Sequence, residues 1–367
     1  MFRLKRAVAA GTAVILLAGS LTACGGSGDA GVTGQTSRTS GAKSTQTETR
    51  TAAAQKSTQA ETPQASADTV DIVDVNSTER PFALSVNNTP VAVKVQTGLN
   101  RAFLVYELPT EGRTSRLLAL FKNVDDDLTV GTIRSARHYF LDYCFESDAI
   151  FVHYGWSHYA EDAVRETGID DINGLTDSPF WRDNPENLGN DHTAYTSIAQ
   201  DKACAAEKGF ASDADDASDT ILLNYDPGDI DLSEREDAVS ADSVSIPYGA
   251  DHGTVFTYDS ESGEYDRIVN GEPNTDYYTG EQFTARNIIV EKVSHEMTDD
   301  NYYWNIGDIG SGEGYFITGG KAVPITWSKE DQRSKTHYYY ADGTQITVSD
   351  GRTYIEVQPD DMETTIS

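Results

Sequence analysis

The segment GTIRSARHYF, residues 131–140, places two arginines three positions apart with a serine between them. The chain holds only 28 Lys and Arg against 59 Asp and Glu, so this pair needs an explanation. If a helix begins near Ser135, the serine caps it, and free backbone N–H groups and both guanidinium groups converge on one volume. Such a cradle suits phosphate or carboxylate. We therefore predict a ligand-binding set of Arg116, Arg134, Ser135 and Arg137.

The same arginines also have candidate partners within the chain. The segment YELPTEGRTSR supplies Glu107 and Glu111, and an internal ion-pair network would satisfy the arginines without any ligand. Two carboxylates four apart could also act as general acid and base, and His153 falls at the predicted end of a strand, where α/β proteins often bind ligands. Glu107, Glu111 and His153 are thus the catalytic candidates, and whether the protein is an enzyme stays open.

The sequence lacks the motifs that several kinds of chemistry require. His153, His158 and His192 show no close ligand spacing of the H-x-x-x-H kind, so we expect no metal and no cofactor. No nucleophile elbow, phosphate-binding glycine loop or Ser-x-x-Lys motif is present. These absences favour binding over catalysis.

The N-terminus indicates export. Basic residues precede a short apolar run from Ala7 to Leu17, which is too short to span a bilayer and is typical of a signal peptide covering residues 1–23. The following LTAC resembles a bacterial lipobox, which implies cleavage before Cys24 and its acylation with diacylglycerol and palmitate. The bilayer would then be a partner through Cys24, with the protein on the extracytoplasmic face of the cell membrane.

Composition divides the rest of the chain. Residues 24–78 are rich in Ser, Thr, Gln, Ala and Gly, which predicts a disordered tether. The remainder is strongly acidic, which argues against nucleic acid as a partner. We predict an N-terminal domain over 79–215, an acidic linker over 216–240 and a C-terminal domain over 241–367.

Periodicity predicts different structures in the two domains. In the first, strand-like runs such as AFLVYEL and DAIFVHYG alternate with helical patterns, including a helix in SHYAEDAVRETG that ends at Gly168. In the second, alternating runs are separated by Ser-Gly, Gly-Gly and Asp-Gly turns. The fold class is therefore α+β: a mixed α/β N-terminal domain followed by a mostly antiparallel β C-terminal domain.

Several motifs resemble one family. RPFALSVNN, QTGLNRAFLVYELPTEGRTSRLLALF, GTIRSARHYFLD and DAIFVHYGWS resemble, in order and spacing, the N-terminal domain of YerB-like lipoproteins. ARNIIVE, GEGYFITGGKAVPITWSK and YYADGTQITVSDGRTYIEV resemble the C-terminal domain of that family. The resemblance implies architecture and location but no activity. In FWRDNPENLGNDHTAYTS, Arg182 and His192 correspond to a family pattern in which proline, rather than Asp191, precedes the histidine.

The sequence favours a membrane-anchored extracytoplasmic lipoprotein with an anion-recognising cleft. Its role would be binding or scaffolding, with an anionic cell-wall ligand or an envelope protein as partner. The alternative is an envelope hydrolase or transferase acting on glycan or a phosphate-linked polymer. Cys144 lies in an apolar setting, which indicates a buried free thiol, although a disulfide with Cys204 is the other reading.

Overall fold

The computed structural model describes residues 69–300 and 302–367. The signal peptide, Cys24 and most of the predicted tether lie outside these residues. The tether is shorter at its end than predicted, because the described chain already packs from residue 69 onward. Val73 is buried in the core, and Asp71 and Ile72 donate backbone hydrogen bonds to Asp350.

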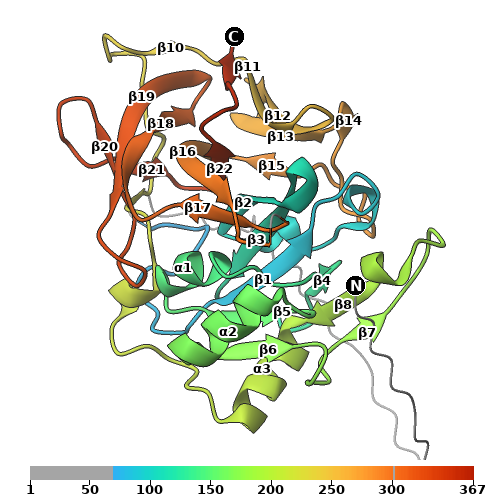
Figure 1. The fold of residues 1–367 in the computed structure, drawn as a ribbon. Coiled ribbons are helices and arrows are strands. Elements are labelled where there is room, and N and C mark those ends of the chain that lie inside the picture. Colours follow the sequence, from blue (N-terminus) through green and yellow to red (C-terminus); the bar gives the residue numbers. More distant parts are fainter. Residues whose placement is uncertain (1–68, 301) are drawn as a thin grey trace, which may run out of the picture. The chain divides into compact units, whose positions relative to one another are not determined.

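A large mixed sheet forms the centre of the described structure (Figure 1). Its spatial order is β10 (Val239–Ser240), β19 (Lys321–Lys329), β18 (Gly310–Thr318), β16 (Asn287–Met297), β22 (Thr353–Pro359), β2 (Leu104–Thr110), β3 (Thr114–Phe121), β1 (Phe82–Asn87), β5 (Ile150–His153) and β6 (Asp171–Asn173). Two further strands pair at its side: β17 (Trp304–Gly307) with β16, and β20 (His337–Tyr340) with β19.

Three smaller sheets complete the β structure. The first has the order β14 (Glu272–Pro273), β13 (Glu264–Val269), β12 (His252–Asp259), β11 (Ser243–Gly249) and β23 (Thr365–Ile366), with β15 (Thr284–Ala285) on β13. The second is β4 (Thr129–Gly131), β8 (Ala194–Ser197) and β7 (Trp181–Arg182), and the third pairs β9 (Tyr225–Asp226) with β21 (Val348–Ser349).

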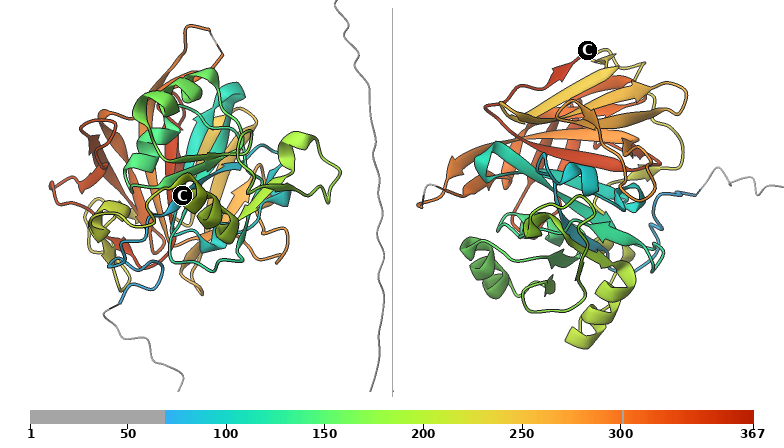
Figure 2. Two further views of the ribbon diagram at one scale, coloured as in Figure 1. Left: turned by 90° about the horizontal axis from the view of Figure 1, so that it is seen from below. Right: turned by 90° about the vertical axis from the view of Figure 1, so that its right-hand side faces the viewer.

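The helices of the described chain belong to its N-terminal half. They are α1 (Phe140–Phe145), α2 (His158–Thr167) and α3 (Ile198–Lys208), with short 3₁₀ turns at Val93–Val95, Leu99–Arg101, Glu111–Arg113, Asn190–His192 and Ala217–Thr220. Figure 2 shows these helices on the opposite side of the molecule from the β11–β13 sheet. Helix α2 begins and ends as predicted: the Ser157 side chain accepts from the Ala160 N–H, and Gly168 ends it with a φ of 65°.

Both faces of the central sheet are buried. Alternate residues of β2 and β3 point to opposite sides, as the two-residue period of a strand requires. Tyr106 and Leu118 face one core together with α1, and Val105 and Leu117 face a second core under the β11–β13 sheet. The α+β fold class is confirmed, with helices in the first half and mostly antiparallel strands in the second.

The prediction of two separable domains is wrong. Strand β2 of the first half pairs in parallel with β22 of the second, with Leu104 opposite Thr353, so the two halves share one sheet and its cores. The segment 216–240 is not a free linker either, because Ile221, Leu222 and Leu232 are buried in the core. Local composition missed this, since the pairing joins residues about 250 positions apart in the chain.

Candidate functional site

The segment that carries Arg134 lies across the carboxyl ends of two parallel strands. Strands β1 and β5 pair only as far as Leu84 opposite Val152, and the chain at Arg134 then enters between them. The Arg134 N–H donates to the Ser85 carbonyl (2.7 Å), and its own carbonyl accepts from the Tyr154 N–H (2.9 Å). The carboxyl edge of parallel strands is the usual binding position in open α/β sheets. The backbone therefore fixes Arg134 at such an edge.

Ser135 does not cap a helix, which corrects the first prediction. Helix α1 starts at Phe140, five residues later than the sequence indicated. Backbone hydrogen bonds from Arg134 and Ala136 to the ends of β1 and β5 hold this stretch extended instead. The Ser135 hydroxyl donates to the Tyr154 carbonyl at 3.1 Å. In the described chain no helix begins at Ser135, so the predicted cradle of backbone N–H groups does not form there.

Arg137 and Arg116 pair inside the protein, as the alternative prediction held. Arg137 is buried and makes a two-pronged contact with the Glu111 carboxylate, its Nε donating at 2.8 Å. Arg116 lies 3.5 Å from the same carboxylate and donates to the Ser135 carbonyl at 2.5 Å. Burial alone would raise the pKa of Glu111, but Arg137 and Arg116 outweigh it and hold that pKa below its ordinary value. One carboxylate thus serves two arginines.

Arg134 is the member of the cluster that lacks a firm partner. The nearest carboxylate is that of Asp191, 3.5 Å from the guanidinium on a side chain that is 72% exposed. The Arg134 Nε is buried without a hydrogen-bond partner among the described residues. Arg134 also adds to the positive potential at Arg116. Among the described residues, the carboxylates within 4 Å of these three arginines are Glu111 and the exposed Asp191, which leaves a local excess of positive charge in a chain whose formal net charge is −31.

Asn87 and His192 lie beside Arg134. The Asn87 side-chain N–H₂ donates to the Asp191 carbonyl (3.3 Å) and lies 2.9 Å from the His192 Nδ1. Because that nitrogen of His192 faces a donor, it acts as an acceptor, and the proton of the neutral ring sits on Nε2. Burial and the charge of Arg134 lower the pKa of His192. A neutral His192 can still donate from Nε2.

Arg182 approaches the same turn from β7. Its guanidinium donates to the Asn190 carbonyl (2.5 Å) and lies 4.7 Å from the centre of the Tyr154 ring. Within the part of the chain that the structure describes, no carboxylate lies within 4 Å of Arg182. We call Asn87, Arg134, Arg182 and His192 the strand-edge site. Arg182 and His192 fall in the segment that resembles a family pattern, whereas Asn87 carries no sequence signal beyond its place at the end of a strand.

Glu107, a catalytic candidate, is a buried structural anion. Its carboxylate accepts hydrogen bonds from Asn88 (2.9 Å), Ser115 (2.6 Å), Thr254 (2.9 Å) and Arg267 (2.6 Å). Neither Glu107 nor Arg267 is exposed. Burial works to raise the pKa of Glu107, but Arg267 and the surrounding donors lower it below its ordinary value. With both oxygens occupied, this carboxylate holds the two halves together.

Arg267 was missed by the sequence reading, although a signal existed. In EYDRIV the inward positions of β13 are Tyr265, Arg267 and Val269, so an arginine occupies a core position of an alternating strand. Such a residue requires a buried carboxylate partner.

His153 is likewise unavailable for catalysis. Its side chain is fully buried, with Nδ1 at 2.8 Å from the Gly155 carbonyl and Nε2 at 3.1 Å from the Asp171 carboxylate. Both ring nitrogens are directed at oxygens inside the protein, so neither is directed at a surface that a substrate could reach. The histidine orients the ends of β5 and β6.

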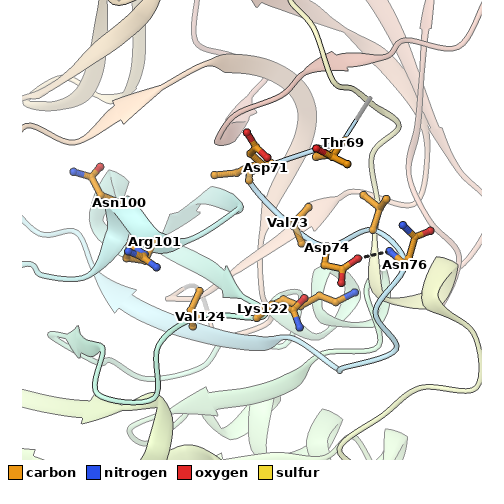
Figure 3. Close-up of a pocket in the computed structure, with 13 residues that line it drawn as sticks. Thr69, Asp71, Val73, Asp74, Asn76, Asn100, Arg101, Lys122 and Val124 are labelled. Atoms are coloured by element: carbon orange, nitrogen blue, oxygen red, sulfur yellow. Dashed lines mark hydrogen bonds between the residues drawn. The ribbon is translucent and has the colours of Figure 1, made fainter. Parts of the chain in front are cut away.

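Five pockets among the described residues lie away from these side chains. The largest of five, about 800 Å³, is lined by residues 69–76, Asn100, Arg101 and residues 122–124 (Figure 3). Figure 3 shows Asp71 and Asp74 on the same wall, with Lys122 below them. The Lys122 ammonium is already bound by the Ser77 carbonyl (2.7 Å) and the Thr220 hydroxyl (2.5 Å). None of the five is lined by Glu107, Glu111, Arg134 or His153.

The structure also bears on the cysteines, on metal binding and on membrane spans. Cys144 and Cys204 are both free thiols, with Cys144 buried, so the disulfide reading is wrong. Among the described residues, no group of three or more His, Cys, Asp or Glu could hold a metal ion. The described helices include none long and apolar enough to cross a bilayer.

The comparisons define the class of protein. Residues 46–211 match the N-terminal domain, and residues 244–355 the C-terminal domain, of a family described as "Protein of unknown function (DUF3048)". The chain belongs to this family. It is 31% identical over 286 residues to the Bacillus subtilis (strain 168) protein named "Putative lipoprotein YerB", covering 77% of this chain and 82% of that protein. The fold is similar to the crystal structure of YerB from Bacillus subtilis, with a TM-score of 0.68 and 29% identity over 80% of this chain and 95% of that one. The resemblance to YerB-like lipoproteins is confirmed.

Proposed function

We propose that this protein is a lipid-anchored lipoprotein of the cell envelope that binds an anionic ligand at the strand-edge site. The observation that carries the proposal is the state of Arg134: a guanidinium at the carboxyl edge of β1 and β5, with a buried Nε that has no described partner. A buried polar group without a hydrogen bond costs stability, so a donor left in this state supports an external acceptor.

The neighbouring groups suit an oxyanion. Arg182 and the Nε2 of His192 add donors at the Asn190–His192 turn. Bidentate and charge-assisted hydrogen bonds from arginine are the strongest that side chains make to phosphate or carboxylate. An anionic segment of a cell-wall polymer offers both kinds of group.

The placement of the catalytic candidates supports binding over hydrolysis. The hydrogen-bonding capacity of Glu107 and His153 is filled by internal partners. Glu111 is engaged by two arginines, and its lowered pKa keeps it ionised. A general base needs a lone pair within reach of substrate.

Anchoring rests on Cys24 and on the lipoprotein relative. Two or more acyl chains hold a protein on a membrane stably, since each buried CH₂ contributes about 0.8 kcal/mol. Replacement Cys24→Ala should leave the protein unlipidated, released from membranes or retained as an uncleaved precursor. A variant that fractionates and migrates like the wild type would exclude the anchor.

The binding proposal is tested by titration calorimetry at low salt with inorganic phosphate and with glycerol 3-phosphate. The wild type should bind, and Arg134→Gln should weaken binding at least tenfold, since the loss of a charge-assisted pair is worth more than about 1.4 kcal/mol. Arg101→Gln is the matched control, because Arg101 is exposed and paired with Asp125 elsewhere on the surface. Equal binding by Arg134→Gln and the wild type, or no binding by the wild type, would reject the strand-edge site as an anion site.

A further inference from the structure

A β-hairpin arm from the second half reaches the helices of the first. We define the arm as Ser294–Met297 of β16 and Trp304–Asp308, in which the two strands pair antiparallel from Ser294 opposite Gly307 to Met297 opposite Trp304. The Asn305 side chain lies 2.9 Å from His138, which precedes α1. The Tyr303 ring, at the start of the second strand, covers the guanidinium of Arg137 at 5.1 Å. The arm is thus docked on the segment that carries the arginine cluster.

Two aspartates meet at the base of this arm. Asp308 ends the arm and is 3% exposed, and its Oδ2 has no donor among the described residues. Its carboxyl lies against that of Asp142 on α1, close enough for a hydrogen bond between the two side chains. Asp142 is also buried and accepts from the Gln332 side chain at 2.6 Å. Two carboxyl groups in contact can hydrogen-bond only when they share a proton.

The surroundings contain too little positive charge to neutralise this pair. Lys329 is the buried cation that acts on both aspartates, but its ammonium is already 2.6 Å from the Glu146 carboxylate. A fourth carboxyl, Glu291 on β16, accepts from Tyr338 (2.8 Å) and Tyr143 (3.3 Å). The groups that face Asp142 and Asp308 are, by element, Tyr139, Tyr143, Cys144 and Glu146 from the α1 region, Glu291 from β16, Lys329 from β19 and Gln332 from the loop after it.

The electrostatics agree with a protonated pair. Burial raises the pKa of Asp308 to about 9, with Asp142 and Glu291 adding to the shift. Burial raises the pKa of Asp142 to about 6 against the opposing effects of Gln332 and Lys329. Burial, with Glu146, raises the pKa of Glu291 to about 8. If the arm lifted away from α1, the pKa of each aspartate would return to its ordinary value of about 4.

We infer that the arm is a pH-responsive element, docked on α1 while Asp142 and Asp308 share a proton and released when both ionise. The docked state binds this proton more tightly than the released state, so docking is favoured at low pH and weakens as pH rises. The dependence begins above about pH 4, where the released aspartates ionise. Between about pH 6 and about pH 9 the docked pair holds one proton that the released pair does not, and this range is the window of one-proton linkage. Release would uncover Arg137 and change how the exposed side chains of Met297, Tyr302 and Ile309 are presented to a partner.

Hydrogen exchange of the full folded protein tests this inference. We would compare amide exchange between pH 5.5 and 9, corrected for the intrinsic rate, in Trp304–Asp308 and, as an internal reference, in α2. The opening equilibrium of the arm should rise by up to tenfold per pH unit inside the window, as linkage to one proton requires. Asp308→Asn, which keeps a hydrogen bond to Asp142 without a titrating group, should flatten this dependence. The control Asp162→Asn changes an exposed carboxylate of α2 and should keep the wild-type slope.

Each outcome decides the question. The inference is overturned if the corrected amide exchange in the wild-type arm does not change with pH. It is also overturned if the opening equilibrium of Asp308→Asn keeps the wild-type dependence on pH. If Asp308→Asn fails to fold, Asp142→Asn removes the same shared proton from the other side and should show the same flat profile.

Discussion

The buried pair Glu107–Arg267 provides a strong test of how the two halves are joined. Both side chains are fully buried, Glu107 on β2 and Arg267 on β13, and they lie 2.6 Å apart. Replacing Arg267 with Met keeps much of the volume and removes the charge. The Glu107 carboxylate would then be buried without a cation, a change that usually costs 3–5 kcal/mol, so we expect a loss of about 4 kcal/mol in the free energy of unfolding.

The double variant Arg267→Met/Glu107→Gln should recover part of this loss. The neutral amide can keep the donors from Ser115 and Thr254 only in part, but no charge remains without a partner. We expect the double variant to be more stable than Arg267→Met by about 2 kcal/mol, a coupling within the range for residues in direct contact. Urea denaturation at pH 7, followed by far-UV circular dichroism, measures all three proteins.

Arg165→Met is the control, because Arg165 is an exposed arginine paired with Glu161 on α2. Such pairs contribute about 0–1 kcal/mol, so its removal should change stability little. The reasoning fails if Arg267→Met loses less than about 1 kcal/mol, or if adding Glu107→Gln makes the protein still less stable.

Three further predictions concern other parts of the molecule. Arg137→Ala should lose about 3 kcal/mol of folding free energy, because the Glu111 carboxylate loses its closest cation, whereas Arg134→Ala should lose under about 1 kcal/mol; urea denaturation compares them. Proteolytic cleavage between residues 229 and 238 should leave the halves associated in gel filtration, since β2 and β22 pair, and separation would contradict the shared sheet. Alkylation should label half-exposed Cys204 well before Cys144, whose thiol pKa is raised by burial; equal rates would refute this.

Local signals predicted the elements that local interactions determine. Helix α2 has its capping serine, its closing glycine and its apolar spacing within about ten residues, and the structure matches them. The segment around Ser135 has a helical pattern too, but its backbone is bound by the ends of β1 and β5. Those strands lie outside any local window, so the spacing alone could not reveal that tertiary hydrogen bonds had replaced the helix.

The candidate site could be predicted only in part, because some of its contacts join residues that are far apart in the sequence. Residue types indicated that the arginines could meet Glu107 or Glu111, and the structure brings Arg116 and Arg137 to Glu111. The true partner of Glu107 is 160 residues away, and no sequence pattern links the two. The isolated position of Arg134 also depends on geometry, because only the structure shows that its neighbours have used their carboxylate.

In the proposed strand-edge site, Asp191 would compete with a bound anion for Arg134. It lies 3.5 Å from Arg134 on an exposed side chain. An exposed pair of this length contributes about 0–1 kcal/mol, so an incoming anion must displace a weak competitor. Asp191→Asn should therefore tighten binding of glycerol 3-phosphate by up to about fivefold.

Asp125→Asn is the control, since Asp125 is equally exposed, at 72%, and pairs with Arg101 away from the site. Both variants remove one negative charge, so the general repulsion between the acidic protein and the anion changes equally. A difference in affinity between them would therefore come from competition between Asp191 and the anion for Arg134. Calorimetry at low salt that finds the same affinity for the two variants would show that Asp191 does not compete for Arg134.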